Sequence, residues 1–172
     1  MTKSTKGNHF LTVKEIGKKK KGAETHTVYL GIGTNLGNKE GNLHKAIELL
    51  EECAGKVLRV SSFLATEPWG FKSNNGFLNA AVCIETVLDP FELLDVTQYI
   101  ERKMGRKEKS VGGAYHDRII DIDILLYDSL AISSDTLTVP HPLMKERKFV
   151  MEPLREILPQ ENFSSFFPIV RE

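Results

Sequence analysis

The sequence has no apolar run of the length that a membrane span needs, and it has very little cysteine. A bilayer-spanning helix requires about 20 consecutive apolar residues, and no stretch of these 172 residues approaches that length. Cys53 and Cys83 are the two cysteines, and no Cys-x-x-Cys motif or Cys/His cluster accompanies them. We therefore expect two small buried hydrophobic side chains in a reducing compartment. Membrane proteins are excluded, and we expect a cytoplasmic location.

Net charge is also absent, because 23 basic and 23 acidic residues cancel. The balance differs along the chain: residues 1–24 hold seven lysines and two glutamates, a net charge of +5, which leaves −5 for the rest. A mildly acidic body cannot attract polyphosphate by overall charge, so any nucleotide site must be built from placed groups or metal ions. We interpret residues 1–26 as a basic, disordered leader, since its lysine run lacks arginine and interleaved aromatic residues.

The remaining residues, 27–172, have the length of a single domain. β-type runs predict strands at residues 27–33, 57–66, 77–87 and 118–127, whereas the 3.6-residue apolar rhythm predicts helices ended by Gly55 and by Gly105. The order β-α-β-β-α-β indicates an α+β, ferredoxin-like antiparallel sheet with its helices on one face. The other face would be left for loops and ligand. A C-terminal extension adds a short strand near residues 130–132 and helical segments between residues 143 and 158.

Two aspartates in the last of these strands are the first sign of chemistry. Asp121 and Asp123 are two residues apart, so both project from one face, with backbones about 7 Å apart. Two carboxylates 4 Å apart repel by about 1 kcal/mol in water and about 4 kcal/mol in a surface-like dielectric. Flanking isoleucines and leucines predict a strand inside the protein. Two interpretations remain open: a structural ion-pair network with Arg118 and lysines, or a two-ion metal site.

Several motifs accompany this pair in a fixed order. They are Gly31-Ile32-Gly33-Thr34-Asn35-Leu36-Gly37, Ser61-Ser62-Phe63, Thr66-Glu67-Pro68-Trp69-Gly70, Phe77-Leu78-Asn79-Ala80-Ala81, Asp121-Ile122-Asp123, Thr138-Val139-Pro140-His141-Pro142 and Glu152-Pro153-Leu154. Together they resemble the 6-hydroxymethyl-7,8-dihydropterin pyrophosphokinase family of folate biosynthesis, over about residues 28–159. The resemblance implies transfer of the β,γ-pyrophosphoryl group of ATP to the hydroxymethyl oxygen of the reduced pterin, with release of AMP.

The resemblance also assigns the nucleotide side of the site. It implies that Asp121 and Asp123 bind two Mg²⁺ ions, which bridge the ATP phosphates and activate the attacking hydroxyl. Arg118 and Arg147 would act with them in catalysis. The other positions matched to ATP contacts are Gln98, Glu101, Arg106, Lys109, Tyr115, Ile124, Thr138, His141 and Lys145. Taken alone, Gln98 and Glu101 fit a solvated helix face, and His141 fits a turn residue.

For the pterin, the resemblance implies that Phe77 and Phe149 sandwich the ring. Each such stacked pair contributes on the order of 1 kcal/mol beyond buried area. Asn79 would bind the polar edge through its amide, and the other implied contacts are Thr66, Glu67, Pro68, Trp69 and Tyr115. A lone phenylalanine in an apolar strand is usually core, but a buried asparagine needs hydrogen-bond partners.

The sequence departs from the family in one place. Many members have Arg-Trp-Gly-Pro-Arg before the paired aspartates, where this chain has Ala114-Tyr115-His116-Asp117-Arg118. One phosphate contact is therefore missing, and Tyr115 replaces the tryptophan that helps to close the site. Arg106, Lys107 and Lys109 are the candidates to compensate. The departure puts loop closure and turnover rate in question.

Two other functions fit parts of the pattern. An RNA-binding module shares the β-α-β-β-α-β order, but it needs basic and aromatic residues on the open sheet face, where Asp121 and Asp123 would repel phosphate. Another metal-dependent nucleotidyl transferase would also use paired aspartates, but it would not require Phe77, Asn79 and Phe149 together. We favour the pyrophosphokinase, a monomer that binds only small-molecule substrates and neither nucleic acid nor membrane.

Overall fold

The computed structural model describes residues 12, 15, 22–67, 76–105 and 118–160. Most of the predicted leader, residues 1–26, lies outside this range. The elements of the body follow in this order: β1 (His26–Thr34), α2 (Lys39–Cys53), β2 (Lys56–Val60), β3 (Leu64–Thr66), β4 (Phe77–Thr86), α3 (Pro90–Lys103) and β5 (Asp121–Tyr127). The C-terminal extension consists of β6 (Ile132–Ser133), β7 (Thr138–Val139), the short 3₁₀ helix η1 (Met144–Glu146) and α4 (Lys148–Ile157).

Polar caps fix the starts of the two main helices. The Asn38 side chain accepts a hydrogen bond from the Gly41 amide at the start of α2. At α3, the Asp89 side chain accepts from the amides of Phe91 and Glu92, and the Glu92 side chain accepts from the Asp89 amide. This is a complete capping box. Both helices therefore begin where their caps satisfy the first free amides.

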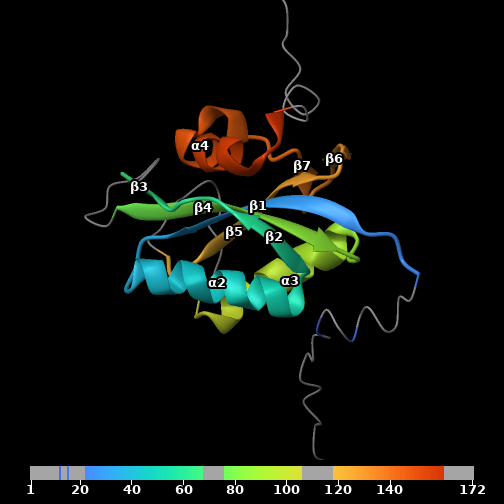
Figure 1. Ribbon diagram of the computed structural model, residues 1–172, viewed down its shortest axis with the longest axis horizontal. Helices are drawn as coiled ribbons and strands as arrows, with labels where there is room; N and C mark the ends of the chain where they lie inside the picture. Colours follow the sequence, from blue (N-terminus) through green and yellow to red (C-terminus); the bar gives the residue numbers. More distant parts are fainter. Residues whose placement is uncertain (1–11, 13–14, 16–21, 68–75, 106–117, 161–172) are drawn as a thin grey trace, which may run out of the picture.

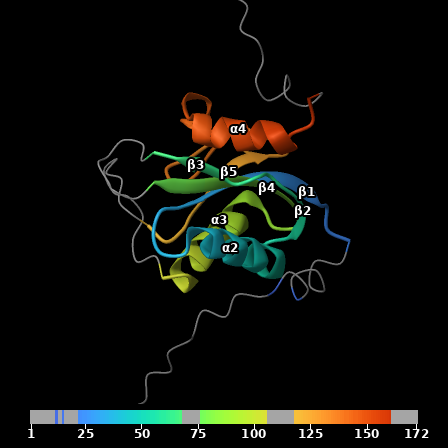
Figure 2. The ribbon, with the colours of Figure 1, turned by 60° about the vertical axis from the view of Figure 1, so that its left-hand side comes forward.

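The strand order of the main sheet is β2-β4-β1-β5, with all pairs antiparallel and with β3 also paired to β4. Counted without β3, this is the ferredoxin-like arrangement that the sequence predicts. Helices α2 and α3 lie together on one face of the sheet, as Figures 1 and 2 show. The predicted α+β fold is confirmed.

Side chains alternate between two hydrophobic cores, one on each face of the sheet. The helix-side core takes Val28, Leu30 and Ile32 of β1 together with residues of α2 and α3. The opposite core takes Tyr29 of β1 and packs against α4. The expectation that this second face would be left to loops and ligand is therefore wrong in part. Helix α4 covers some of it (Figure 2).

Both cysteines are buried and free, as the sequence predicts. Burial raises the pKa of the Cys53 and Cys83 thiols, so neither forms a reactive thiolate readily. Within the described ranges, no helix combines the length and apolar character that a bilayer span requires.

Strand β5 is mostly buried, as the flanking isoleucines and leucines predict, although it ends the strand order of the described sheet and so is not a central strand. Two of its backbone groups are bonded from outside the sheet: the Ile122 amide donates to Glu101 at 2.9 Å, and the Leu125 carbonyl accepts from the His141 amide at 3.0 Å. Burial of β5 therefore comes from α3 and the C-terminal extension rather than from a second neighbouring strand.

The predicted strand at residues 57–66 is two strands along the same edge of β4. Ser61 and Ser62 lie at the break, where the Ser61 hydroxyl accepts from the Ala81 amide at 2.8 Å. The carboxylate of Glu156, on α4, accepts from the Ser62 amide at 2.8 Å and from the Ser62 hydroxyl at 2.7 Å. The break thus attaches the β2–β3 edge to α4.

This attachment predicts an acid-sensitive contribution to stability. The two hydrogen bonds from Ser62 lower the pKa of Glu156, so their contribution is present above the ordinary glutamate pKa of about 4.3 and disappears as the pH falls through the lowered value. We expect Glu156→Gln to be less stable than the parent at pH 7 and the two proteins to converge in strong acid. Urea unfolding between pH 3 and 7 measures this, with Glu152→Gln on the same helix as control; a constant difference would contradict it.

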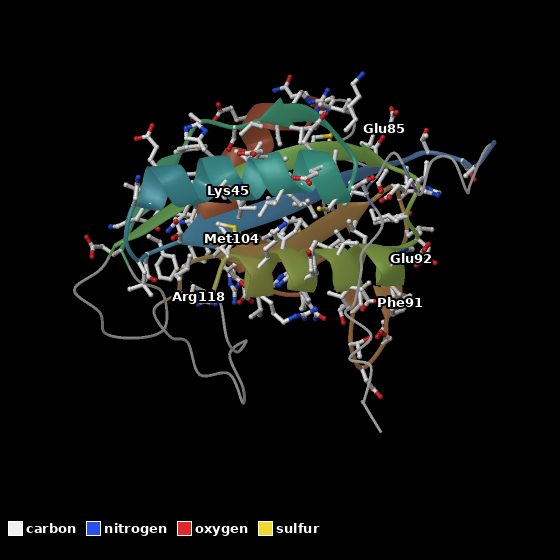
Figure 3. The ribbon with its side chains drawn as sticks, turned by 90° about the horizontal axis from the view of Figure 1, so that it is seen from below. Lys45, Glu85, Phe91, Glu92, Met104 and Arg118 are labelled. Carbon is white, nitrogen blue, oxygen red and sulfur yellow. The ribbon has the colours of Figure 1, made fainter. Side chains whose placement is uncertain are left out.

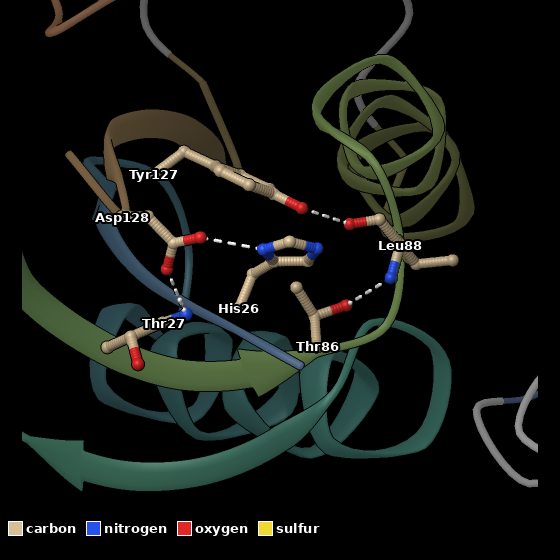
Figure 4. A network of polar contacts seen from close by, with 6 residues as sticks. All are labelled: His26, Thr27, Thr86, Leu88, Tyr127 and Asp128. Carbon is tan, nitrogen blue, oxygen red and sulfur yellow. Dashed lines mark hydrogen bonds and ion pairs between the residues drawn. The ribbon is translucent and has the colours of Figure 1, made fainter. Parts of the chain in front are cut away.

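A polar network closes the end of the sheet where β1 begins and β5 ends (Figure 4). The His26 Nδ1 atom lies 2.6 Å from the Asp128 carboxylate, whose other oxygen accepts from the Thr27 amide at 2.8 Å. The Tyr127 hydroxyl donates to the Leu88 carbonyl. The candidate site lies at the other end of the same strands.

Candidate active site

A cleft lies at the end of the sheet where β1 ends and β4 and β5 begin, on the face that carries α4. It encloses about 630 Å³, including its open mouth, a size typical of small-molecule sites. Nine of the predicted site residues line it: Thr66, Glu67, Phe77, Asn79, Arg118, Asp121, Asp123, Arg147 and Phe149.

The strand register explains how these side chains meet. Gly33 of β1 pairs with Asn79 on one side and with Asp121 on the other, and Gly31 pairs with Asp123. Paired Cα atoms are about 5 Å apart, so Asn79 and Asp121 face the same side about 10 Å apart. Because glycine has no side chain, no side chain of β1 separates Asn79 from Asp121.

A cation accompanies the aspartates. An Arg118 guanidinium nitrogen lies 3.5 Å from an Asp121 carboxylate oxygen, with both side chains mostly buried. The structural ion-pair interpretation of the aspartate pair is therefore supported for Asp121. Within the described residues, no group of three or more His, Cys, Asp or Glu side chains could hold a metal ion. Asp121 and Asp123 thus offer a metal ion two carboxylates, and not a complete set of protein ligands.

Asn79 is held in a fixed orientation. It is 7% exposed, and its side-chain nitrogen donates to the Thr66 hydroxyl at 3.0 Å. Its side-chain oxygen lies 2.6 Å from the position that a Cβ atom on Gly33 would take. The amide therefore lies over the glycine, between the two neighbouring strands.

The two predicted aromatic side chains come from different elements, and both line the cleft. Phe77 begins β4, and the Arg118 guanidinium carbon lies 5.5 Å from its ring centre. Phe149 lies in the first turn of α4, and the Arg147 guanidinium carbon lies 5.8 Å from its ring centre. Each aromatic ring thus has an arginine beside it, at distances typical of cation–π contact.

The other predicted nucleotide residues that the structure describes do not line the cleft. Gln98 and Glu101 lie on α3, and Glu101 is 2% exposed, so the solvated-face interpretation is wrong for Glu101. Ile124 belongs to the helix-side core. Thr138 and Lys145 are exposed in the C-terminal extension. The His141 ring accepts from the Leu143 amide at 3.4 Å, as a turn residue does.

Five further predicted residues cannot be placed, since Pro68, Trp69, Arg106, Lys109 and Tyr115 lie outside the described residues. Conversely, the sequence interpretation gave no role to Gly33, Leu125 or Val150, which line the cleft. The alternation of Gly31 and Gly33 was the available signal for the first of these, because two glycines on one strand face leave room for another molecule.

Gly33→Ala is expected to weaken binding of the pterin that the sequence resemblance implies about tenfold, because the new methyl group displaces the Asn79 oxygen and so moves the amide. Gly31→Ala is the matched comparison, since its Cβ atom meets only the Leu125 side chain, at 3.5 Å. Titration calorimetry with the pterin measures both. Equal affinities in the two variants would contradict the role given to Gly33.

Fold and cleft together define the class: a ferredoxin-like domain with a small-molecule site, in which paired carboxylates lie beside arginine and aromatic side chains. The sequence profile of the 7,8-dihydro-6-hydroxymethylpterin-pyrophosphokinase (HPPK) family matches residues 29–159. The chain belongs to this family.

Two similar proteins with the name 2-amino-4-hydroxy-6-hydroxymethyldihydropteridine pyrophosphokinase support this family assignment. The protein of Porphyromonas gingivalis is 48% identical over 133 residues, which are 77% of this chain and 90% of that protein. The protein of Bacillus subtilis is 44% identical over 133 residues, 77% of this chain and 78% of that protein.

The fold is also found in a solved structure. The crystal structure of Plasmodium falciparum HPPK-DHPS with SDX-DHP superimposes with a TM-score of 0.63 at 18% identity, and the match covers 78% of this chain. It covers 41% of the longer Plasmodium chain. This likeness supports the fold alone.

Proposed function

We propose that this protein transfers the β,γ-pyrophosphoryl group of ATP to the hydroxymethyl group of 6-hydroxymethyl-7,8-dihydropterin in folate biosynthesis. The hydroxymethyl oxygen attacks the β-phosphorus, the bond from that phosphorus to the α,β-bridging oxygen breaks, and AMP leaves with the bridging oxygen while the hydroxyl loses its proton. The observation that carries the proposal is the row Asn79–Gly33–Asp121, in which the Cα atoms of Asn79 and Asp121 are about 10 Å apart on the cleft side. It supports a pterin contact at one end of the row and a phosphate-side carboxylate at the other.

Asp121 and Asp123 are the proposed ligands of two Mg²⁺ ions. The donor set fits this ion, because Mg²⁺ in phosphoryl-transfer sites is bound by one or two carboxylates and takes its other ligands from phosphates and water. When bound, the ions would neutralise phosphate charge and lower the pKa of the attacking hydroxyl. The acidic body of the protein needs such neutralisation to bind a triphosphate.

Arg118 and Arg147 are proposed to bind phosphate oxygens from two sides of the cleft. Arg118 lies three residues before β5 begins, and Arg147 directly precedes α4. Arginine suits this role because its planar guanidinium can donate two parallel hydrogen bonds to a phosphate. In the described cleft Arg118 contacts Asp121, so we expect it to turn from the carboxylate to phosphate as metal and ATP bind.

Phe77 and Phe149 are proposed to sandwich the pterin ring, with Asn79 and Thr66 at its polar edge. Both rings line the cleft, Phe77 from β4 and Phe149 from α4, which supports a site for a flat molecule there. Arg118 and Arg147 line the same cleft and lie beside these rings, which supports phosphate binding next to the pterin. Glu67 lines the cleft, and Pro68, Trp69 and Tyr115 complete the proposed pterin contacts.

The adenosine part of ATP is proposed to lie along the outer side of β5. Ile124 belongs to this strand, and two other proposed residues bond its backbone: Glu101 accepts from the Ile122 amide, and the His141 amide donates to the Leu125 carbonyl. Gln98 lies one turn before Glu101 on the same helix. The remaining proposed contacts are Thr138, Lys145, Arg106 and Lys109.

We further propose that residues 27–172 act as a single domain, a monomer in the cytoplasm, with the lysine-rich leader outside the catalytic unit. No role for nucleic acid or membrane is needed, because every proposed contact serves a small molecule.

The direct test is incubation of the protein with ATP, Mg²⁺ and 6-hydroxymethyl-7,8-dihydropterin, followed by chromatography. The expected products are AMP and the diphosphorylated pterin in equal amounts, and EDTA should stop their formation. Release of ADP with a singly phosphorylated pterin would indicate transfer of one phosphate instead. No reaction with the pterin would contradict the proposal.

A further inference from the structure

The turn after β1 is joined to the segment just before β5 by a reciprocal pair of hydrogen bonds. The Asn35 side-chain oxygen accepts from the Arg118 amide at 2.6 Å, and the Asn35 amide donates to the Arg118 carbonyl at 3.1 Å. Asn35 is 0% exposed. The β1–β5 pairing ends at Gly33 and Asp121, so this pair of bonds fixes the backbone just beyond the last strand pair.

Arg118 is the residue whose position depends most on this attachment. Its guanidinium group lies 3.5 Å from Asp121 and 5.5 Å from the ring centre of Phe77. It therefore stands between the proposed metal side and the proposed pterin side of the cleft. A long side chain can hold such a place only when its backbone is fixed, because small backbone shifts are amplified at its end.

The turn itself has a second, separate set of bonds. The Asn42 side-chain nitrogen donates to the Thr34 hydroxyl at 3.2 Å and to the Leu36 carbonyl at 2.8 Å. These bonds hold the β1–α2 turn in shape without touching residue 118. Loss of the Asn35 side chain would thus release the start of β5 more than it releases the turn.

We propose that Asn35 is a positioning residue for pyrophosphoryl transfer: through the Arg118 backbone, it sets the place of the guanidinium between Asp121 and Phe77. The inference rests on the proposed function of Arg118 at the phosphates. An amide is suited to this place because its oxygen satisfies a peptide N–H that is otherwise buried, and such a donor is costly to leave unpaired.

The test compares Asn35→Ala with Asn42→Ala by steady-state kinetics and thermal unfolding. We expect Asn35→Ala to lower kcat roughly 10- to 100-fold, the scale of a misplacement of about 1 Å, with KM for the pterin changed less than threefold. Asn42→Ala should lower the unfolding temperature but keep kcat within about twofold. Asn35→Asp, which keeps an acceptor oxygen at the same place, should restore most of kcat.

A double-mutant cycle shows whether Asn35 acts through Arg118. In the Arg118→Ala background, Asn35→Ala should cause no further loss of kcat. Additive losses, or an unchanged kcat in Asn35→Ala beside a large loss in Arg118→Ala, would overturn the inference. An unchanged kcat in Arg118→Ala would instead overturn the proposed role of Arg118.

If Asn35→Ala does not fold, Asn35→Ser replaces it in every comparison. The serine hydroxyl stands where the asparagine Cγ atom was, so it is too short to bond the Arg118 amide as the asparagine oxygen does. The same loss of kcat is expected, and full activity of Asn35→Ser would contradict the proposal.

Discussion

Alanine in place of Asp121 or Asp123 is expected to lower kcat for pyrophosphoryl transfer at least about a thousandfold. Metal ions supply several kcal/mol of charge stabilisation in such reactions, and each 1.36 kcal/mol corresponds to a factor of ten in rate. The protein should stay folded, because neither side chain belongs to either hydrophobic core. Asp121→Ala also removes the ion pair with Arg118, so we expect a lower unfolding temperature for it than for Asp123→Ala. The measurements are AMP release at saturating substrates and the thermal unfolding temperature.

Two further variants sharpen this experiment. Asp121→Asn and Asp123→Asn keep the shape of the side chains and remove only the charge, so they separate metal binding from packing. Asp95→Ala, on the exposed side of α3, is the control for loss of an acidic residue and should keep its full rate. Turnover close to normal in either Asp121→Ala or Asp123→Ala would leave only the structural ion-pair interpretation.

Phe149→Ala is expected to weaken pterin binding by about 1 to 3 kcal/mol, a factor of roughly 5 to 150, through lost buried area and lost stacking. Binding of a nonhydrolysable ATP analogue should change much less, because the proposed nucleotide contacts come from other residues. Calorimetric titration of the pterin, with the ATP analogue present, gives the affinity directly.

The matched control is Phe91→Ala. Phe91 is 46% exposed at the start of α3, and Figure 3 shows it at the opposite end of that helix from Arg118. Pterin affinity should be unchanged in this variant. Phe149→Leu, which keeps most of the apolar area but loses the stacked ring, should fall between the parent and Phe149→Ala. Parental affinity in Phe149→Ala would remove this residue from the pterin site.

Local signals in the sequence predicted the parts of the fold that depend on neighbouring residues. The Asp89 cap and its Glu92 partner form the predicted start of α3, and Gly105, with a φ of +99°, follows its end. Hydrogen bonds between residues three or four positions apart form such features, so the local sequence is enough to predict them.

Features that depend on distant residues were harder to predict. The isoleucines and leucines of β5 correctly indicated burial, but burial does not tell whether a second strand or other elements provide it. In the structure Glu101 and His141 bond its backbone from outside the sheet. The break between β2 and β3 likewise depends on Glu156, 94 residues away from Ser62 in the chain.

In the candidate site, too, some features follow from the local sequence and others depend on residues far apart in the chain. Alternation along β4 and β5 places Phe77, Asn79, Asp121 and Asp123 on one face, so the sequence could group them. Their actual distances depend on the register across Gly33, which no local pattern specifies. The contribution of Asn35 was missed for a similar reason, because its bonds to Arg118 span 83 residues.

The most direct test is a crystal structure of the protein with a nonhydrolysable ATP analogue, Mg²⁺ and the pterin. The account predicts carboxylate oxygens of Asp121 and Asp123 at about 2.1 Å from Mg²⁺, with the triphosphate beside Arg118 and the pterin between Phe77 and Phe149. A triphosphate bound elsewhere, or ions without contact to these two aspartates, would contradict it.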